Sequence, residues 1–348
     1  MSRHLRRLNM NAIFKANPHR IFPLMEQETE RRSERKPLPL LGQYIGSKHQ
    51  AMRKLVHHIP PHDRYVSLFG GIGSEFAVKE QSEIEVFNDI DRNLVAVFRI
   101  LQDPDHLPRL VARIQCMPNS RVDFYEARAL LCTSSATDFQ RAYATLVVLN
   151  HMYRAAPIAK ASWTPSHATR NLRRNLRDFI QQWAERVRDV ALECESWRFV
   201  LDRYDSETTC FFVDPPYHPE TVKNQCYSHT MTRDEHHELL IRLRKVKGFV
   251  MLCGYEHESY DALLWDWRRM WHQRKASKGR TSKKEVVWMN FESDYTKISK
   301  NQLLVAVRFA EAVGGIEKGC QLLRQAKSML EPQHNKNADE DTSKERLQ

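Results

Sequence analysis

Buried β-strands and amphipathic helices alternate along the middle of this chain. The clearest strand is Thr209-Cys210-Phe211-Phe212-Val213, which is β-branched and aromatic with no polar alternation. Such a run is typical of a strand that is covered on both faces in a parallel sheet. Similar apolar runs predict further strands at residues 65–69, 84–87, 248–253, 285–291 and 303–307. The pattern therefore predicts an α/β fold in which helices cover a mixed sheet.

Helical periodicity predicts the elements between these strands. A helix after Lys48 is expected to end at Pro60-Pro61, and residues 92–150 have a helical pattern. Thr232 and Glu235 form a capping box that predicts a helix through about Lys247. A further helix has an apolar face at Leu176, Phe179, Ile180, Trp183, Val187 and Val190 and places Arg177, Arg186 and Arg188 on another face.

The charge of the chain indicates a polyanionic partner. Among 348 residues there are 54 Lys and Arg against 43 Asp and Glu, a net charge of +11. This surplus favours nucleic acid before a membrane. Two segments without acids, 153–177 and 272–284, hold six Lys or Arg each, and the first also contains Trp163. Basic residues interleaved with an aromatic ring suit a surface that follows a phosphate backbone.

Several classes of protein are disfavoured. No apolar run approaches the ~18 residues that span a bilayer, and no apolar segment follows the basic N-terminus as a secretory signal would require. The seven cysteines are odd in number and include no C-x-x-C pair, and the 16 histidines show no H-E-x-x-H pattern. We expect a soluble protein of a reducing intracellular compartment with no metal.

An acidic turn follows the clearest strand at its carboxyl end. It consists of Asp214-Pro215-Pro216-Tyr217, and open α/β sheets bind ligands at this end of their strands. The two prolines remove two backbone donors, so the carbonyls of the turn stay available to a ligand. A carboxylate, a carbonyl and a flat ring suit a planar base with an exocyclic amine. The same residues also suit a Pro-Pro turn that the aspartate merely caps.

A glycine turn predicts a second ligand contact. Residues 70–73 read Gly-Gly-Ile-Gly between a strand and a helix expected from about Ser74, where glycine lets the backbone approach a ligand. Phe76 replaces the third glycine of the dinucleotide fingerprint. About 20 residues further on, Asp89 follows the next strand, as an acid that binds ribose hydroxyls would. The pattern favours S-adenosyl-L-methionine (AdoMet) over NAD.

Together these segments resemble the D12 class of DNA N6-adenine methyltransferases, the Dam-like family, and within it the phage-encoded DNA adenine methylases. Motif X of that family matches residues 44–48, motif I matches 69–73 and motif IV matches 214–217. The resemblance covers about residues 38–292, with the motif order of the family's α arrangement. The segments Gly254-Tyr255 and 285–290 are similar to the phage-encoded group.

The resemblance implies a fold, an activity and roles for single residues. The fold is a Rossmann-like AdoMet-dependent methyltransferase sheet with a mainly helical target-recognition insert. The activity is methyl transfer from AdoMet to the N6 amine of a flipped adenine in DNA, in a bacterial or phage-infected host cytoplasm. Catalytic roles fall to Asp214, Pro215, Pro216 and Tyr217, and AdoMet binding to Tyr44, Lys48, Phe69, Gly70, Gly71, Gly73, Asp89 and Asp214.

The target of the reaction stays open at this point. Asn150-His151-Met152-Tyr153-Arg154 stands where Dam-type enzymes carry an Asn-Gly-Leu-x-Arg-like sequence, so a GATC target does not follow. The motif IV clamp also suits N4-cytosine and RNA adenine methyltransferases. A DNA-binding protein that has lost catalysis is a third alternative.

The motifs also predict a division of the chain into parts. A basic arm occupies 1–37, the catalytic domain 38–120 and 205–310, the helical insert 121–204, and a C-terminal helix with a polar tail 311–348.

Overall fold

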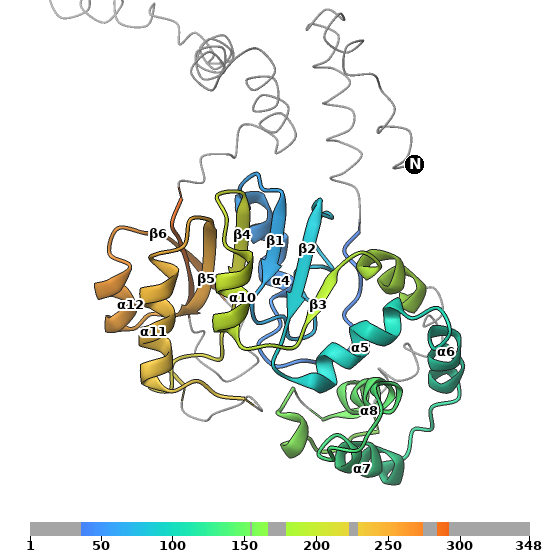
Figure 1. Ribbon diagram of the computed structural model, residues 1–348. Coiled ribbons are helices and arrows are strands. Elements are labelled where there is room, and N and C mark those ends of the chain that lie inside the picture. Colours follow the sequence, from blue (N-terminus) through green and yellow to red (C-terminus); the bar gives the residue numbers. More distant parts are fainter. Residues whose placement is uncertain (1–35, 154, 166–178, 223–228, 274–283, 292–348) are drawn as a thin grey trace, which may run out of the picture. The chain divides into compact units, whose positions relative to one another are not determined.

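One mixed sheet with helices on both faces forms the core of the structure (Figure 1). The computed structural model describes residues 36–153, 155–165, 179–222, 229–273 and 284–291, all within the compact unit Arg31–Lys297. The described residues form a seven-stranded sheet with the order β3-β2-β1-β4-β5-β7-β6. The strands are β1 Arg64–Ser67, β2 Ile84–Asn88, β3 Ala191–Glu193, β4 Thr209–Val213, β5 Phe249–Tyr255, β6 Arg268–Gln273 and β7 Lys284–Met289.

The strand directions define a doubly wound sheet. Strands β3, β2, β1, β4 and β5 run parallel, and β7 is antiparallel to both β5 and β6. The order of the strands reverses between β1 and β4, where Val66 pairs with Val86 on one side and Phe211 on the other. Open α/β sheets bind ligands at such a switch point. The structure confirms the predicted Rossmann-like α/β sheet, with β1 and β4 as neighbours.

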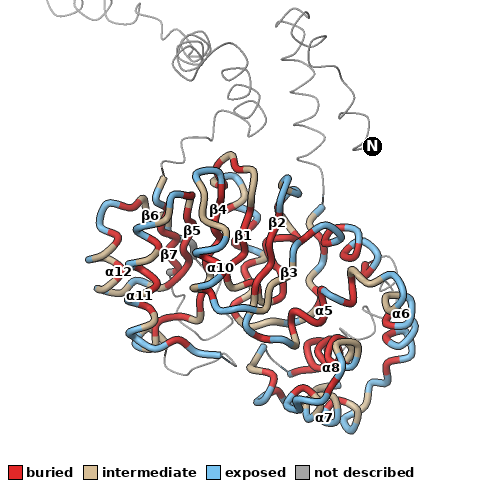
Figure 2. The backbone as a smooth tube through the Cα atoms, viewed as in Figure 1, coloured by how far each residue is buried: buried red, intermediate tan, exposed pale blue. Residues whose placement is uncertain are grey.

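Apolar side chains form a core on each face of the sheet, because successive residues of a strand point to opposite sides. Tyr65 and Phe212 belong to one core, and Val66 and Phe211 to the other. All five residues of β4 are buried, which confirms the prediction of a strand covered on both faces. Figure 2 shows the central strands coloured as buried.

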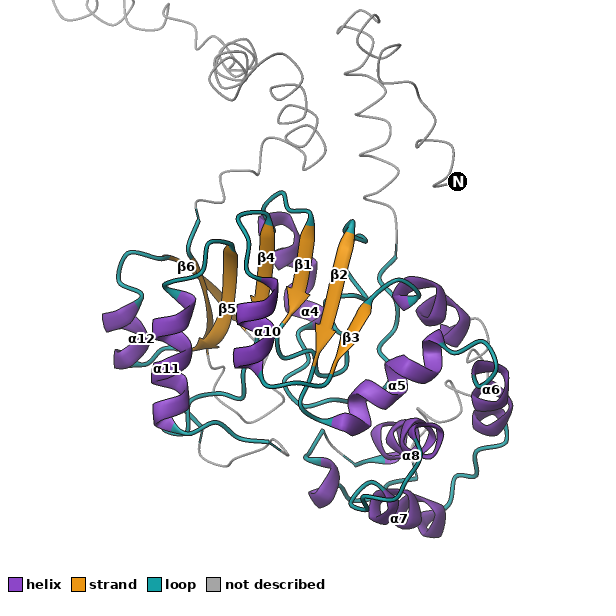
Figure 3. Cartoon of the chain, in the orientation of Figure 1, coloured by secondary structure: helices purple, strands orange, loops and turns teal. Residues whose placement is uncertain are grey.

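Different helices cover the two faces. The core around Tyr65 includes residues of α4, α5, α8 and the helical segment 179–187, whereas the core around Val66 includes α10, α11 and α12. Figure 3 shows α10 and α11 side by side over the strands and α5 to α8 grouped beyond β3. The helices are α4 His49–Leu55, α5 Arg92–Gln102, α6 Leu107–Gln115, α7 Arg121–Leu130, α8 Asp138–His151, α10 Trp197–Tyr204, α11 Arg233–Leu243 and α12 Glu258–Leu263, with 3-10 turns η1 Val56–His58 and η2 Ile158–Lys160.

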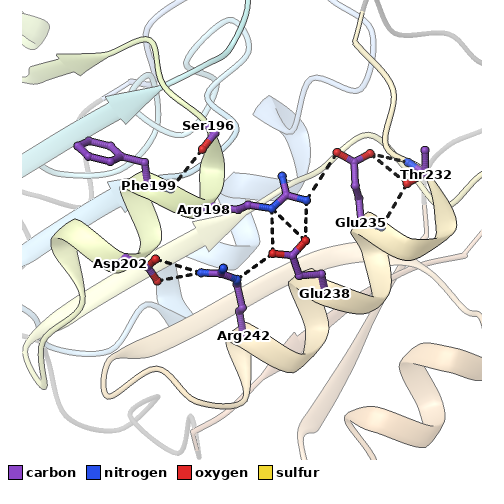
Figure 4. A network of polar contacts seen from close by, with 8 residues as sticks. All are labelled: Ser196, Arg198, Phe199, Asp202, Thr232, Glu235, Glu238 and Arg242. Atoms are coloured by element: carbon purple, nitrogen blue, oxygen red, sulfur yellow. Dashed lines mark hydrogen bonds and ion pairs between the residues drawn. The ribbon is translucent and has the colours of Figure 1, made fainter.

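A network of charged side chains joins α10 to α11 (Figure 4). Arg198 of α10 donates to both carboxylate oxygens of Glu238 of α11, from Nε at 2.9 and 3.0 Å and from Nη2 at 2.6 Å. Arg242 donates to the same glutamate at 3.0 Å and to Asp202 of α10 at 3.0 Å. The predicted capping box at the start of α11 is confirmed by the structure.

The ends of some elements differ from the prediction. Strand β1 ends at Ser67, and the helix expected from Ser74 is wrong, since residues 71–78 form successive turns. Strands β3 and β6 were not predicted because both lie at the edges of the sheet, β3 is short and β6 is rich in polar residues. Strand β3 joins the sheet from within the stretch 121–204 assigned to the insert. The strand predicted at 303–307 lies outside the described residues.

Arg186, which the sequence places on the arginine face of the helix at 179–187, contacts the sheet. Its guanidinium is buried and donates to Glu85 of β2 from Nη1 at 2.5 Å and from Nη2 at 2.9 Å. Lys79 also pairs with Glu85. Burial opposes the charge of this carboxylate, but Lys79 and Arg186 hold the pKa of Glu85 below its usual value. These three side chains therefore tie the helix to the sheet.

No helix in the part of the chain that the structure describes is long and apolar enough to cross a membrane.

Candidate active site

A pocket opens at the switch point between β1 and β4, where the two strands end. It encloses about 670 Å³ of space, counting the part that opens to solvent. Eight residues assigned to the site from the sequence line this pocket: Tyr44, Lys48, Phe69, Gly70, Gly71, Asp89, Asp214 and Pro216. Gly73, Pro215 and Tyr217 lie next to these residues in the chain but are not among those lining the pocket.

The glycine turn after β1 forms the floor of the pocket and depends on two glycines. Gly71 has a φ of +55°, and a Cβ added there would lie 3.0 Å from the ring of Tyr44. A Cβ on Gly70 would lie 2.2 Å from the ring of Phe87. Only glycine therefore lets this backbone pass between the two rings.

Asp89 holds the glycine turn against the tip of β2. Its Oδ2 accepts a hydrogen bond from the Gly71 amide at 2.7 Å, and its Oδ1 accepts from the Asp91 amide at 2.8 Å. Burial raises the pKa of Asp89 to about 6, although both amide bonds act in the opposite direction. Each carboxylate oxygen has a second lone pair, so Asp89 can accept from a ligand hydroxyl while it keeps these bonds.

Lys48 stands at the start of α4 and points its side chain into the pocket. Its Nζ donates to the Gly46 carbonyl at 3.0 Å and to Asp214 Oδ2 at 2.8 Å. The ammonium also lies 5.0 Å from the centre of the Tyr217 ring. Burial disfavours the charge, but Asp214, with smaller contributions from Tyr217 and Glu285, holds the pKa of Lys48 well above its usual value. Lys48 is therefore a fixed cation beside the motif IV aspartate.

The segment that carries Tyr44 and Lys48 is anchored to α8. The Gln43 amide donates to the Leu149 carbonyl at 3.0 Å, and Asn150 Nδ2 donates to the Leu41 carbonyl at 2.9 Å. Asn150 stands in the sequence at the position that begins the recognition segment of Dam-type enzymes. In this structure its amide group supports the wall of the pocket.

Tyr217 lies behind the pocket and is only 7% exposed. Its ring meets the ring of Tyr255 edge to face, with centres 4.5 Å apart. Tyr255 is the last residue of β5 and belongs to the Gly-Tyr pair that the sequence singled out. The Asp-Pro-Pro-Tyr turn is therefore braced by β5 on one side and by Lys48 on the other.

Glu75 is a residue of the pocket that the sequence did not reveal. It is 3% exposed and accepts a hydrogen bond from the Ser67 hydroxyl at the end of β1. Burial raises the pKa of Glu75 to about 7, although the Ser67 bond acts in the opposite direction. The pocket therefore contains, besides Asp214, a carboxyl group whose pKa lies near neutral pH. The sequence offered no signal for it, because a glutamate in an expected helix is usually exposed.

Most of the predicted nucleic-acid surface falls outside the described residues. This holds for Arg170, Arg173 and Arg174 and for residues 274–283. Within the described part, the Arg121 guanidinium lies 5.0 Å from the ring of Trp163. Residues 1–35 of the predicted basic arm and residues 292–348, which include the predicted C-terminal helix and tail, also lie outside it.

Comparison with known proteins identifies the family of the chain. The family model for D12 class N6 adenine-specific DNA methyltransferases matches residues 44–261, so the chain belongs to this family. The match spans all three motifs that line the pocket. No curated protein sequence matches the chain. Among solved structures, a Clostridium thermocellum protein described as an rRNA methylase matches with a TM-score of 0.32 and 10% identity, over 70% of this chain and 96% of that one.

Proposed function

We propose that this chain transfers a methyl group from AdoMet to the N6 amine of an adenine that is flipped out of DNA. Membership of the D12 family supports adenine as the base and DNA as the substrate. The main observation in support is that Asp214 and the glycine turn line the same pocket. A group that accepts from an amine thereby faces a site suited to a nucleoside.

The residues of the pocket suit AdoMet. Because Gly71 has no Cβ, the space beside the Tyr44 ring stays free for a ligand. Asp89, at the tip of β2, has lone pairs that can accept from ribose hydroxyls. Phe69, Ile72 and Ile90 add apolar walls. Bound here, AdoMet would supply an electrophilic methyl group.

Asp214 and its neighbours would prepare the base for the reaction. The lone pair of the adenine amine is delocalised into the ring, so an acceptor for its N–H bonds makes the nitrogen more nucleophilic. The Asp214 carboxylate and the Pro215 carbonyl are our candidates for these acceptors. Both would also stabilise the positive charge that develops on the nitrogen. Lys48 would hold the carboxylate in place through its 2.8 Å contact.

Tyr217 is proposed to support this arrangement. Stacking of a flipped base on an aromatic ring contributes about 1–3 kcal/mol. The ring would need to become more exposed than it is here, because Lys48 and Tyr255 both contact it.

We further propose the group within the family, the partner and the compartment of the protein. Features after β5 support a place among the phage-encoded members, and the net charge of +11 supports DNA as the partner. Cysteine usage supports action in the cytoplasm.

A transfer assay with methyl-labelled AdoMet tests the proposed reaction. Duplex DNA, single-stranded DNA and RNA are supplied separately, and each product is digested to nucleosides. We expect label in N6-methyladenine from DNA. Label in N4-methylcytosine or only in RNA would replace the proposal, and binding of DNA without any transfer would support an inactive binding protein.

A further inference from the structure

Two histidines and a glutamate meet just beyond the Asp-Pro-Pro-Tyr turn. His218 and Glu220 follow the turn directly, and His257 precedes α12. One ligand atom from each of the three side chains lies within 4.8 Å of the other two. The His218 and His257 ring centres are 3.8 Å apart. No spacing rule links these residues, which is why the sequence predicted no metal site.

We propose that His218, Glu220 and His257 bind a divalent transition metal ion, with zinc as the best match. Two imidazoles and one carboxylate form a donor set that zinc uses when a fourth position stays open. A site for a softer metal ion such as Cu(I) would need cysteine, and a site for Ca²⁺ or Mg²⁺ would need more oxygen donors.

The contact between His257 and Glu220 shows where the metal would enter. His257 Nε2 lies 2.8 Å from Glu220 Oε2. In the metal-free protein a proton occupies this gap. Bonds of about 2.0–2.2 Å to a tetrahedral zinc require a separation of roughly 3.4 Å between two donor atoms. A shift of about half an ångström therefore turns the hydrogen bond into two metal bonds, with the proton moving from Nε2 to the other ring nitrogen.

The surroundings of these donors would support the metal. Glu220 uses its other oxygen, Oε1, to pair with Arg233, so this ion pair can persist when Oε2 binds the metal. His257 Nδ1 accepts from the Ser259 amide at 3.3 Å and lies 2.7 Å from the Ser259 hydroxyl. When Nε2 binds the metal, the ring proton would move to Nδ1, and the Ser259 hydroxyl would accept it in place of the amide bond. Metal-binding histidines usually have such an outer partner.

The position of the site gives the metal a structural role. His218 is adjacent to Tyr217 in the chain, and His257, the N-cap of α12, lies two residues after Tyr255. A bound ion would therefore tie the turn after β4 to the turn after β5, on the far side of the Tyr217–Tyr255 contact. Its removal is expected to loosen the Asp214–Tyr217 turn.

Metal binding by the full chain, produced without a histidine tag and stripped with a chelator, tests the proposal. We expect the parent protein to bind one more equivalent of Co²⁺ than the Glu220→Gln and His257→Asn variants do. The additional Co²⁺ should show the visible absorption of a four-coordinate ion. Zinc should displace the Co²⁺. Loss of a ligand should weaken this binding by at least about 100-fold, since loss of an outer partner alone costs about 10–100-fold.

The variants are chosen so that the fold is kept. Gln preserves the shape of the half-exposed Glu220, and Asn is a favourable helix N-cap in place of His257. His237→Asn, at an exposed position of α11, is the matched control and should bind like the parent. Zinc should raise the melting temperature of the parent and of this control but not of the two site variants. Equal metal uptake by all four proteins, or no uptake by the parent, would overturn the proposal.

Discussion

The Lys48 ammonium lies 2.8 Å from the Asp214 carboxylate, although the two residues are 166 positions apart in the chain. The Lys48 side chain is 5% exposed and the Asp214 side chain 17%. The pair joins the segment before α4 to the turn after β4, and both residues line the candidate pocket. Motifs X and IV are thus parts of one electrostatic unit.

Lys48→Met should destabilise the protein, because the Asp214 carboxylate would lose its cation in a largely buried site. Breaking one partner of a buried ion pair costs about 3–5 kcal/mol; the remaining exposure of Asp214 places the expected loss near the lower limit. Urea unfolding measures it. Lys54→Met, on the exposed side of α4, is the control and should change stability by less than about 0.5 kcal/mol. Adding Asp214→Asn to Lys48→Met should restore part of the loss. Strictly additive effects would contradict the coupling.

Asp214→Asn should lower methyl transfer by about 100- to 1,000-fold, the cost of losing one preorganised acceptor. The asparagine keeps the shape but can present an NH₂ group to the amine. AdoMet affinity should change much less, because most of the pocket lies around Tyr44, Gly71 and Asp89. Single-turnover transfer and AdoMet titration on the same preparation measure both quantities. A folded variant with near-parent transfer would refute the proposed mechanism and leave Asp214 as a turn cap.

Asp89→Ala should weaken AdoMet binding more than DNA binding. The variant removes the lone pairs proposed for the ribose and also frees the Gly71 amide from its 2.7 Å bond. Titrations with AdoMet and with duplex DNA give the two affinities. Asp105→Ala, which removes an exposed acid outside the pocket, is the control and should change neither affinity. Equal loss of both affinities in Asp89→Ala would indicate general misfolding.

Glu75 should make stability fall as pH rises. Its pKa of about 7 in the folded protein exceeds the ordinary value of 4.5, so between these values the folded state keeps a proton that the unfolded state releases. The accompanying loss is up to about 3 kcal/mol. Glu75→Gln should therefore match the parent near pH 5 and exceed its stability near pH 8, as measured by urea unfolding across this range. Asp89 contributes in the same direction in both proteins. Parallel pH profiles would show that Glu75 does not titrate in this way.

Arg186→Met should destabilise the protein by about 3–5 kcal/mol, because it leaves Glu85 buried with Lys79 alone. Arg188→Met, in the turn directly after the same helix, is the matched control. Arg188 is 61% exposed and pairs with an equally exposed Glu185, and such a pair contributes at most about 1 kcal/mol. Thermal or urea unfolding distinguishes the two. Similar losses in both variants would mean that Arg186 is not the tie between helix and sheet.

Local patterns in the sequence determined the central strands and the two turns that carry the motifs. An uninterrupted apolar run such as 209–213 has few alternatives to a doubly covered strand. The order of glycines at 70–73 and of prolines at 215–216 is likewise local, because each restricts its own backbone. The family could be inferred for the same reason, since its motifs are short and contiguous.

The tertiary structure alone decided which of these residues meet. Lys48 with Asp214, Arg186 with Glu85 and His257 with Glu220 are pairs separated by 166, 101 and 37 positions. No periodicity spans such separations. The sequence treated Arg186 as part of an arginine face and Glu75 as an ordinary helix residue, and packing buried both. A side chain's charge state and partner depend on which distant segments exclude water from it, and that exclusion arises only when the sheet and its helices assemble.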